Sequence, residues 1–251
     1  MSEVVVIGLG QLGRVFAGGF LRCGHTVVPV NRETDARSVA AVHPSPALVL
    51  LAMGEADLAQ ALAEMPFIWR DRVALIQNEL LPLDWEAHGY ADPTVISVWF
   101  EKKAGTDARP LIPSPAAGPG ARLLIDALAT LDLPAREVAS GDALLFELVV
   151  KNVYILTSNL AGLKTGGTVA ELWRDHRAFA RAVAADVIAL QEALTGRTFD
   201  PERLIAGMLV AFDSDPEHRC TGRSAPTRLR RALARANAFG LAVPALRGLT
   251  G

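Results

Sequence analysis

A β-branched run that breaks into closely spaced glycines constrains the fold more than any other part of the 251-residue sequence. Residues 4–7 read Val-Val-Val-Ile, which is typical of a buried parallel strand, and helical spacing resumes over residues 12–20. The turn between them has the Gly-x-Gly-x-x-Gly spacing. In this context the glycines permit a tight turn, the approach of a pyrophosphate and close helix packing. The sequence therefore predicts a dinucleotide site at Gly8, Leu9, Gly10, Gln11, Leu12 and Gly13. The alternative is a glycine turn that binds nothing.

The second expected strand, Thr26–Val30, ends at the residues that would select the coenzyme. Dinucleotide folds place the residue that meets the adenosine ribose here, roughly 20 residues after the glycines. An NAD site favours Asp or Glu, whereas Asn31 is uncharged and Arg32 offers a guanidinium that matches a phosphate. We therefore expect NADP, with Asn31 and Arg32 among the cofactor-binding residues. The alternative is a solvated Arg32 that pairs with Glu33 or Asp35.

Charge and composition exclude several classes of partner. Hydrophobic residues make up 51% of the sequence and the formal net charge is −2, so no basic excess favours nucleic acid. The longest apolar stretch, residues 144–155, is interrupted by Glu147 and Lys151 and is shorter than the roughly 20 residues of a membrane span. We expect the N-terminal apolar run to form a strand rather than a signal peptide. We expect a cytoplasmic protein that binds neither nucleic acid nor membrane.

Cysteine and histidine spacing predicts no metal site. Cys23 and Cys220 lie far apart and outside any Cys-x-x-Cys spacing, which is typical of reduced thiols. The five histidines are scattered, and His176 and His218 have no acid partner at a metal or catalytic spacing. We expect them to be structural or exposed.

Strands alternate with helices up to about residue 140, and helical periods follow. The first pattern predicts an α/β fold, a doubly wound parallel sheet of the Rossmann type, and the second a smaller all-helical domain. We place an NADP-binding Rossmann domain at residues 1–140 and a helical substrate and dimerisation domain at 141–251. Expected strands cover 4–7, 26–30, 47–52, 73–77, 95–100 and 111–113. Expected helices cover 12–20, 57–64, 120–131, 142–163, 169–194, 201–212 and 226–239.

A polar stripe crosses the apolar helix expected from Asp142. Lys151, Tyr154 and Ser158 lie on one face at helical spacing, and Asn159 lies beside it. A lysine on such a stripe can donate to a carbonyl oxygen that gains charge during hydride transfer, and an amide can orient the substrate. An exposed ion pair between Glu147 and Lys151 is the alternative, because acid before base at i, i+4 suits a solvated helix face.

Several motifs together resemble ketopantoate reductase and its relatives, whose superfamily shares the helical C-terminal fold of 6-phosphogluconate dehydrogenase. They are the glycine turn, Asn31-Arg32, Ile76-Gln77-Asn78 and Lys151-Asn152-x-Tyr154-x-x-x-Ser158-Asn159. The resemblance implies that Asn78 lies beside the nicotinamide and substrate, as a cofactor-binding and catalytic residue, and that Lys151 and Asn159 are also catalytic. It also implies a homodimer, because helical domains of this superfamily often dimerise.

The sequence departs from that family at three positions. Glu79 replaces the usual glycine after Asn78, Ile155 replaces a second helix asparagine, and Ser224 stands where the family has a substrate-binding glutamate. The segment around Ser224 is instead basic and hydroxylic, and it could receive a carboxylate or phosphate or could be a solvated loop. Its arginines are Arg219, Arg223 and Arg228, and Ser214 and Thr221 are among the hydroxyl residues near them. We name Ser158, Tyr154, Arg223 and Ser224 as candidate substrate-binding residues.

Two functions follow from these patterns. The first is an NADP-dependent oxidoreductase, resembling ketopantoate reductase, that reduces a small 2-oxo acid or related carbonyl compound by hydride transfer. The second is a catalytically silent NADP(H)-binding regulatory or scaffold protein of the same fold, which the three departures favour. The substrate would be a small molecule, expected to be a carboxylic acid.

Overall fold

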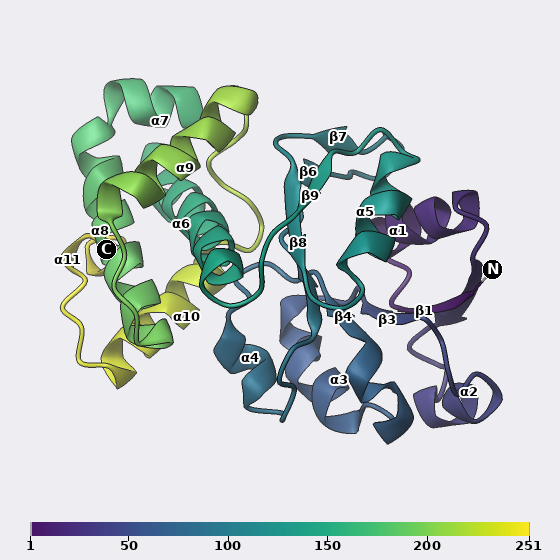
Figure 1. Cartoon of the computed structure of the whole chain (residues 1–251). Helices are drawn as coiled ribbons and strands as arrows, with labels where there is room; N and C mark the ends of the chain where they lie inside the picture. The colour runs from purple at the N-terminus through teal and green to yellow at the C-terminus, as the bar shows by residue number, and fades with distance from the viewer. Residues whose placement is uncertain (1, 251) are drawn as a thin grey trace. The chain divides into compact units, whose positions relative to one another are not determined.

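The structure is a computed structural model that describes residues 2–250. The chain divides into two compact units, residues 1–148 and 149–251, which are described separately below (Figure 1). The division falls inside the helix α6, Asp142–Thr165, whose first two turns belong to the first unit. The roles assigned above to residues 1–140 and 141–251 stay a prediction.

The first unit is built on a seven-stranded, mostly parallel sheet of order β2-β1-β3-β4-β5-β8-β9. Every neighbouring pair is parallel except β5 and β8, which are antiparallel. A separate antiparallel pair is formed by β6 and β7. The strands are β1 (Glu3–Ile7), β2 (Thr26–Val30), β3 (Leu48–Leu51), β4 (Val73–Leu75), β5 (Thr94–Ile96), β6 (Phe100–Glu101), β7 (Arg109–Pro110), β8 (Ser114–Ala117) and β9 (Ala135–Glu137).

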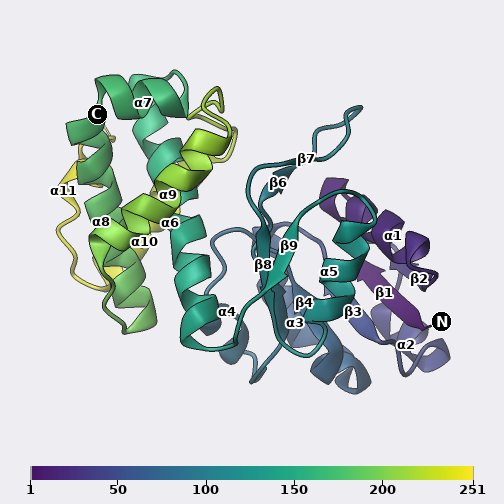
Figure 2. The ribbon, with the colours of Figure 1, turned by 45° about the horizontal axis from the view of Figure 1, so that its top comes forward.

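Helices cover both faces of this sheet, so its central strands are apolar on both sides. On β1, Val4 and Val6 face one core and Val5 faces the other, as the two-residue period of a strand requires. The first core is closed by α1 (Gln11–Arg22) and α5 (Ala121–Ala129). Residues of α2 (Ala36–Val42), α3 (Leu58–Glu64), α4 (Pro82–Glu86) and the start of α6 close the second (Figure 2). Two 3₁₀ helices, η1 (Glu55–Asp57) and η2 (Phe67–Arg72), join these elements.

The second unit is helical and its helices end at local sequence signals. Thr168 and Glu171 form a capping box before α7, and the Asp200 side chain caps α9 ahead of a proline in its first turn. Gly196 ends α8 in the left-handed conformation, with φ 63°. The helices after α6 are α7 (Val169–Asp175), α8 (Arg177–Thr195), α9 (Pro201–Ser214), α10 (Ala225–Ala238) and α11 (Pro244–Arg247).

The helix α6 is longer than the apolar stretch noted in the sequence. It is long and apolar enough to span a membrane by length and composition, with a mean hydropathy of 1.3 over its most apolar window. However, 78% of that window is buried inside the protein. Such burial is typical of a core helix.

Several expected elements are wrong, each for a local reason. The strand expected at 111–113 lies instead at Ser114–Ala117, within a stretch rich in proline and glycine. The single helix expected at 169–194 breaks at His176, whose φ −127° and ψ 27° separate α7 from α8. The run expected as one strand at 95–100 is divided between β5 and β6. α2, α4 and β9 were not expected, since seven, five and three residues are too few to show a clear period.

Candidate functional site

The glycine turn connects β1 to α1 with little space to spare. Gly8 has φ 93°, and its N–H donates to the Val30 carbonyl oxygen at 2.9 Å, which ties the turn to the end of β2. A Cβ added at Gly8 would lie 2.9 Å from the Ala52 carbonyl oxygen, and one added at Gly13 would lie 2.0 Å from the Gly8 carbonyl oxygen. Both positions therefore require glycine, because the atoms that a side chain would meet belong to the backbone.

Gly10 differs from its two neighbours in the motif because it faces open space. A Cβ at this position would meet no atom of the described residues within 4 Å, and Gly10 lines a cavity of about 830 Å³. It is also the N-cap of α1, whose first turn, Gln11-Leu12-Gly13-Arg14, contains no acidic residue. Unpaired backbone N–H groups and the helix dipole at such an end attract phosphate groups. The turn thus fits a coenzyme pyrophosphate.

The cavity extends from the turn to the end of β2 and the segment after β3. Five of the predicted cofactor residues line it: Gly8, Leu9, Gly10, Asn31 and Arg32. Of the others, Gln11 is exposed at the start of α1, Leu12 packs against the core and Gly13 is buried. Arg14, Asp57 and Glu64 also line the cavity and were not predicted. A second cavity of about 590 Å³ shares Asn31 and Glu64 with the first.

The ion pair of Arg32 differs from the pairs considered in the sequence. Its Nη2 atom lies 3.9 Å from Oδ2 of Asp57, and 95% of the Arg32 side chain is exposed. Asp35 instead caps α2, since it accepts hydrogen bonds from the Ser38 hydroxyl at 2.7 Å and from the Arg37 and Ser38 N–H groups. These bonds, the hydroxyl bond foremost, lower the pKa of Asp35. Arg32 is therefore paired across the cavity, not along its own loop.

The turn after β4 places Asn78 at the surface. Gln77 is buried, and its side-chain amide donates to the Leu51 carbonyl oxygen at 2.7 Å, which joins the ends of β3 and β4. Asn78 is exposed and is not among the residues that line either of the two cavities. Glu79 is buried with φ 58°, the left-handed region that favours glycine. That geometry explains why the resemblance implies a glycine at this position.

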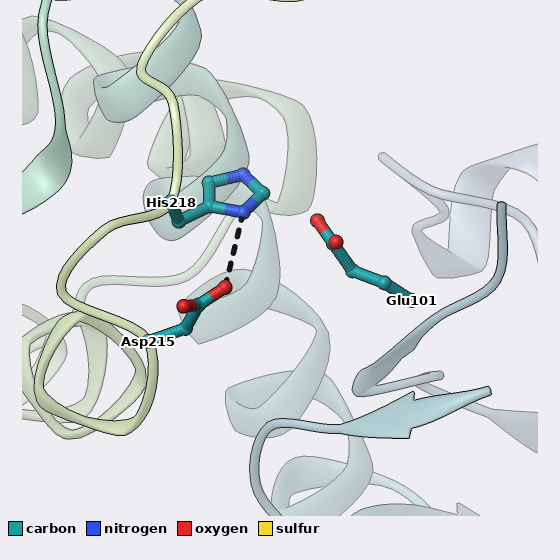
Figure 3. A group of neighbouring side chains, drawn as sticks. All are labelled: Glu101, Asp215 and His218. Atoms are coloured by element: carbon teal, nitrogen blue, oxygen red, sulfur yellow. Dashed lines mark ion pairs between the residues drawn. The ribbon is translucent and has the colours of Figure 1, made fainter. Parts of the chain in front are cut away.

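In the second unit, Lys151 belongs to a row of polar and aromatic side chains. The Lys151 ammonium lies 5.4 Å from the centre of the Tyr154 ring, whose centre lies 6.2 Å from that of His218. The Nδ1 atom of His218 lies 3.7 Å from Oδ2 of Asp215 (Figure 3). We call Lys151, Tyr154, His218 and Asp215 the Lys151 row. The prediction that His218 has no acid partner is wrong, because the loop after α9 turns Asp215 back toward it.

Backbone pairing fixes the loop that carries His218. The Val169 N–H donates to the His218 carbonyl oxygen at 2.9 Å, and the Cys220 N–H donates to that of Gly167 at 3.1 Å. A Cβ at Gly162 of α6 would lie 2.6 Å from the Cys220 Cβ, so the loop lies directly on the helix. Burial, with a smaller contribution from Glu171, raises the pKa of the Cys220 thiol to about 11. This thiol is therefore not a nucleophile at neutral pH.

The two polar residues next along α6 have different environments. Asn159 is buried and accepts a hydrogen bond from the Arg228 guanidinium at 2.7 Å, which connects α6 to α10. Ser158 is also buried, and its hydroxyl donates to the Tyr154 carbonyl oxygen at 2.7 Å. The Ser158 hydroxyl thus donates its hydrogen bond within its own helix, as is common for serine inside helices.

The remaining predicted residues lie at the start of α10. Arg223 and Ser224 are both exposed, and Ser224 occupies the N-cap. The Arg228 N–H donates to the Ser224 carbonyl oxygen at 2.9 Å. The segment therefore presents two guanidinium groups, of Arg223 and Arg228, of which only the second is held against Asn159.

No protein-family model and no curated protein matches the sequence. Solved structures match over nearly the full chain. The 2-dehydropantoate 2-reductase from Methylococcus capsulatus has a TM-score of 0.70 and 14% identity, covering 98% of this chain and 94% of that chain. The chain has the ketopantoate reductase fold. A dimeric ketopantoate reductase from Staphylococcus aureus has a TM-score of 0.70 and 14% identity, and the match covers 98% of this chain and 96% of that chain. A D-mandelate dehydrogenase in complex with NADH has a TM-score of 0.65 and 14% identity, and the match covers 99% of this chain and 96% of that chain.

The ketopantoate reductase fold confirms the sequence resemblance at the level of architecture. It also confirms the predicted fold class, a mostly parallel Rossmann sheet followed by a helical C-terminal part. At these identities the likeness concerns the backbone, and the roles of individual residues rest on their own geometry.

Proposed function

We propose that the protein is an NADPH-dependent oxidoreductase that reduces a small 2-oxo acid or related carbonyl compound by hydride transfer. One observation carries the proposal. The glycine turn, with Gly10 open to a cavity of about 830 Å³ and Arg32 on its wall, occurs in a chain with the ketopantoate reductase fold. The reductases and the dehydrogenase of that fold support a nicotinamide coenzyme.

The preference for NADPH over NADH rests on the end of β2. Asn31 places no negative charge beside the ribose, and the exposed Arg32 guanidinium can meet a 2′-phosphate through two parallel N–H donors. When bound, the coenzyme supplies the hydride. The first turn of α1 holds its pyrophosphate through backbone N–H groups.

In this proposal the Lys151 ammonium donates to the substrate's carbonyl oxygen as negative charge develops there. The Tyr154 ring, 5.4 Å away, helps to hold the ammonium in place. Asn159 and Asn78 orient the substrate, and the guanidinium groups of Arg223 and Arg228 attract its carboxylate. These four roles follow the resemblance and the local charges.

The catalytic proposal is tested with two lysine variants of α6. Lys151→Ala is expected to reduce turnover by orders of magnitude, with NADPH affinity by calorimetry nearly unchanged. Lys164→Ala is the matched control, since Lys164 also lies over an aromatic ring, 5.1 Å from the centre of Phe179. Coenzyme oxidation is followed by absorbance against 2-oxo acids, aldehydes and imines. Full turnover in Lys151→Ala would reject the assignment.

A silent panel would favour the second function. Tight NADPH binding without oxidation of the coenzyme by any compound would identify a binding protein that keeps the fold and lacks the chemistry. Glu79, Ile155 and Ser224 are the departures that favour this alternative.

We further propose a cytoplasmic homodimer. The dimeric ketopantoate reductase of Staphylococcus aureus supports the assembly, and the free thiols of Cys23 and Cys220 are consistent with a reducing compartment. Light scattering at several protein concentrations tests the assembly, and a constant monomer mass would reject it.

A further inference from the structure

The cavity beside the glycine turn is not a purely cationic phosphate site. Two arginines, Arg14 and Arg32, and two acids, Asp57 and Glu64, line it, so their formal charges cancel. The Arg14 Nε atom donates to the Leu9 carbonyl oxygen at 3.0 Å, within the turn itself. Arg32 lies next to Asn31 at the end of β2, and its guanidinium faces the Asp57 carboxylate at 3.9 Å.

We infer that Asp57 sets the coenzyme preference of this site and keeps it weak, so that the protein accepts NADH as well as NADPH. This inference rests on the dinucleotide site of the proposed function. A 2′-phosphate that reaches Arg32 must displace or share the Asp57 carboxylate, and it meets that negative charge at close range. NADH has a 2′-hydroxyl instead, which can donate a hydrogen bond to a nearby carboxylate.

The position of Asp57 supports a role in selection rather than in folding. Its side chain is 59% exposed. It is the N-cap of the short helix α3, yet it makes no side-chain capping hydrogen bond with the described residues. Among the described residues, the Arg32 guanidinium is therefore the one side-chain partner that is lost when the Asp57 charge is removed.

The test compares Asp57→Asn with the wild-type protein by calorimetry, with NADPH, NADH, adenosine 2′,5′-bisphosphate and 5′-AMP as probes. The two smaller probes isolate the ribose end from the nicotinamide end. The expected result is an increase of about 3- to 10-fold in affinity for NADPH and for the bisphosphate. This is the size of effect expected when repulsion between two exposed charges at short range is removed. Affinities for NADH and 5′-AMP stay within about twofold or fall. The gain shrinks in high salt because exposed charges are screened.

Asp71→Asn is the matched control. Asp71 is 79% exposed and pairs with Arg72 at 3.6 Å, as Asp57 pairs with Arg32, but it does not line the cavity. This variant is expected to leave all four affinities unchanged, and thermal unfolding checks that both variants fold.

Two outcomes would overturn the inference. One is an NADPH-to-NADH affinity ratio in Asp57→Asn equal to that of the wild type, and the other is an equal gain in Asp71→Asn. Failure of the proposed function looks different, because then neither the wild type nor any variant binds the four probes.

Discussion

Replacing Gly13 by alanine tests whether close backbone approach at the glycine turn is what the motif requires. The added Cβ would lie 2.0 Å from the Gly8 carbonyl oxygen, whereas ordinary contact begins at 3.4 Å, so the two backbones must separate by about 1.4 Å (3.4 − 2.0). Gly18, in the same helix α1, offers the control. A Cβ there would meet no atom of the described residues within 4 Å.

The two alanine variants should change stability in opposite directions. Alanine in place of glycine inside a helix stabilises by about 0.5–1 kcal/mol, which is the expected effect of Gly18→Ala. Gly13→Ala gains the same stability from helix propensity, but overpacking destabilises it by typically about 1–3 kcal/mol, and by more where the atom in the way belongs to the backbone. Because the obstacle here is a backbone carbonyl, the cost should lie at the upper end of that range, so we expect the free energy of unfolding of the first unit to fall by about 2 kcal/mol. Coenzyme affinity should also fall, because the turn has moved.

Tryptophan fluorescence can report on the first unit alone. Trp69, Trp85 and Trp99 are buried in that unit and Trp173 lies in the second, so a Trp173→Phe background leaves only the first three. Urea titration of both variants in this background gives the stability change, and calorimetry with NADPH gives the affinity. The reasoning is refuted if Gly13→Ala is as stable as Gly18→Ala and binds NADPH with wild-type affinity.

Three further predictions concern single side chains. Arg32→Gln should weaken NADPH binding by about tenfold in calorimetry and leave the affinity for NADH within about twofold of the wild type, since only the 2′-phosphate needs the guanidinium. Equal losses of affinity for NADPH and NADH would contradict this. At pH 8 an aromatic disulfide reagent should modify Cys23 well before Cys220. The pKa of Cys220 is raised to about 11 from 9.0, so its neutral thiol stabilises the fold below pH 9, and this contribution is lost as pH rises through 11. In Cys220→Ala, the curve of unfolding free energy against pH should therefore be flatter between pH 9 and 11. Gln191→Leu should destabilise by about 1–3 kcal/mol in urea titration, because it removes the acceptor, 2.9 Å away, of the buried Asn152 amide.

Local patterns predicted the elements that have a strong period or a strong stop. The strand Thr26–Val30 has its predicted bounds, and α6 begins at the predicted Asp142. The apolar runs at β1 and β3 were also sufficient, because buried parallel strands are apolar throughout. By contrast, β8 contains Pro115 and lies between an antiparallel and a parallel neighbour, so tertiary pairing rather than composition determines it.

The candidate site was predictable where its residues are close in sequence. The glycines and Arg32 belong to one strand–turn–helix–strand unit, and their placement follows from spacing. Asp57 is brought to Arg32 by a third strand, and no spacing rule links the two positions. The Asp215–His218 pair was missed although the two residues lie only three positions apart, because the loop conformation that joins them depends on pairing with residues 167–169.

Both candidate sites depend on glycines that let backbone segments approach closely. Gly13 brings α1 against the turn that opens on the cavity, and Gly162 brings α6 against Cys220, in the loop that presents His218. At both positions the atoms that a Cβ would meet include backbone atoms, which cannot rotate away as a flexible side chain can. A larger residue at either glycine must therefore shift the functional segment itself. For this reason, these positions should tolerate substitution less well than the exposed polar residues of the sites, such as Arg32 or Arg223.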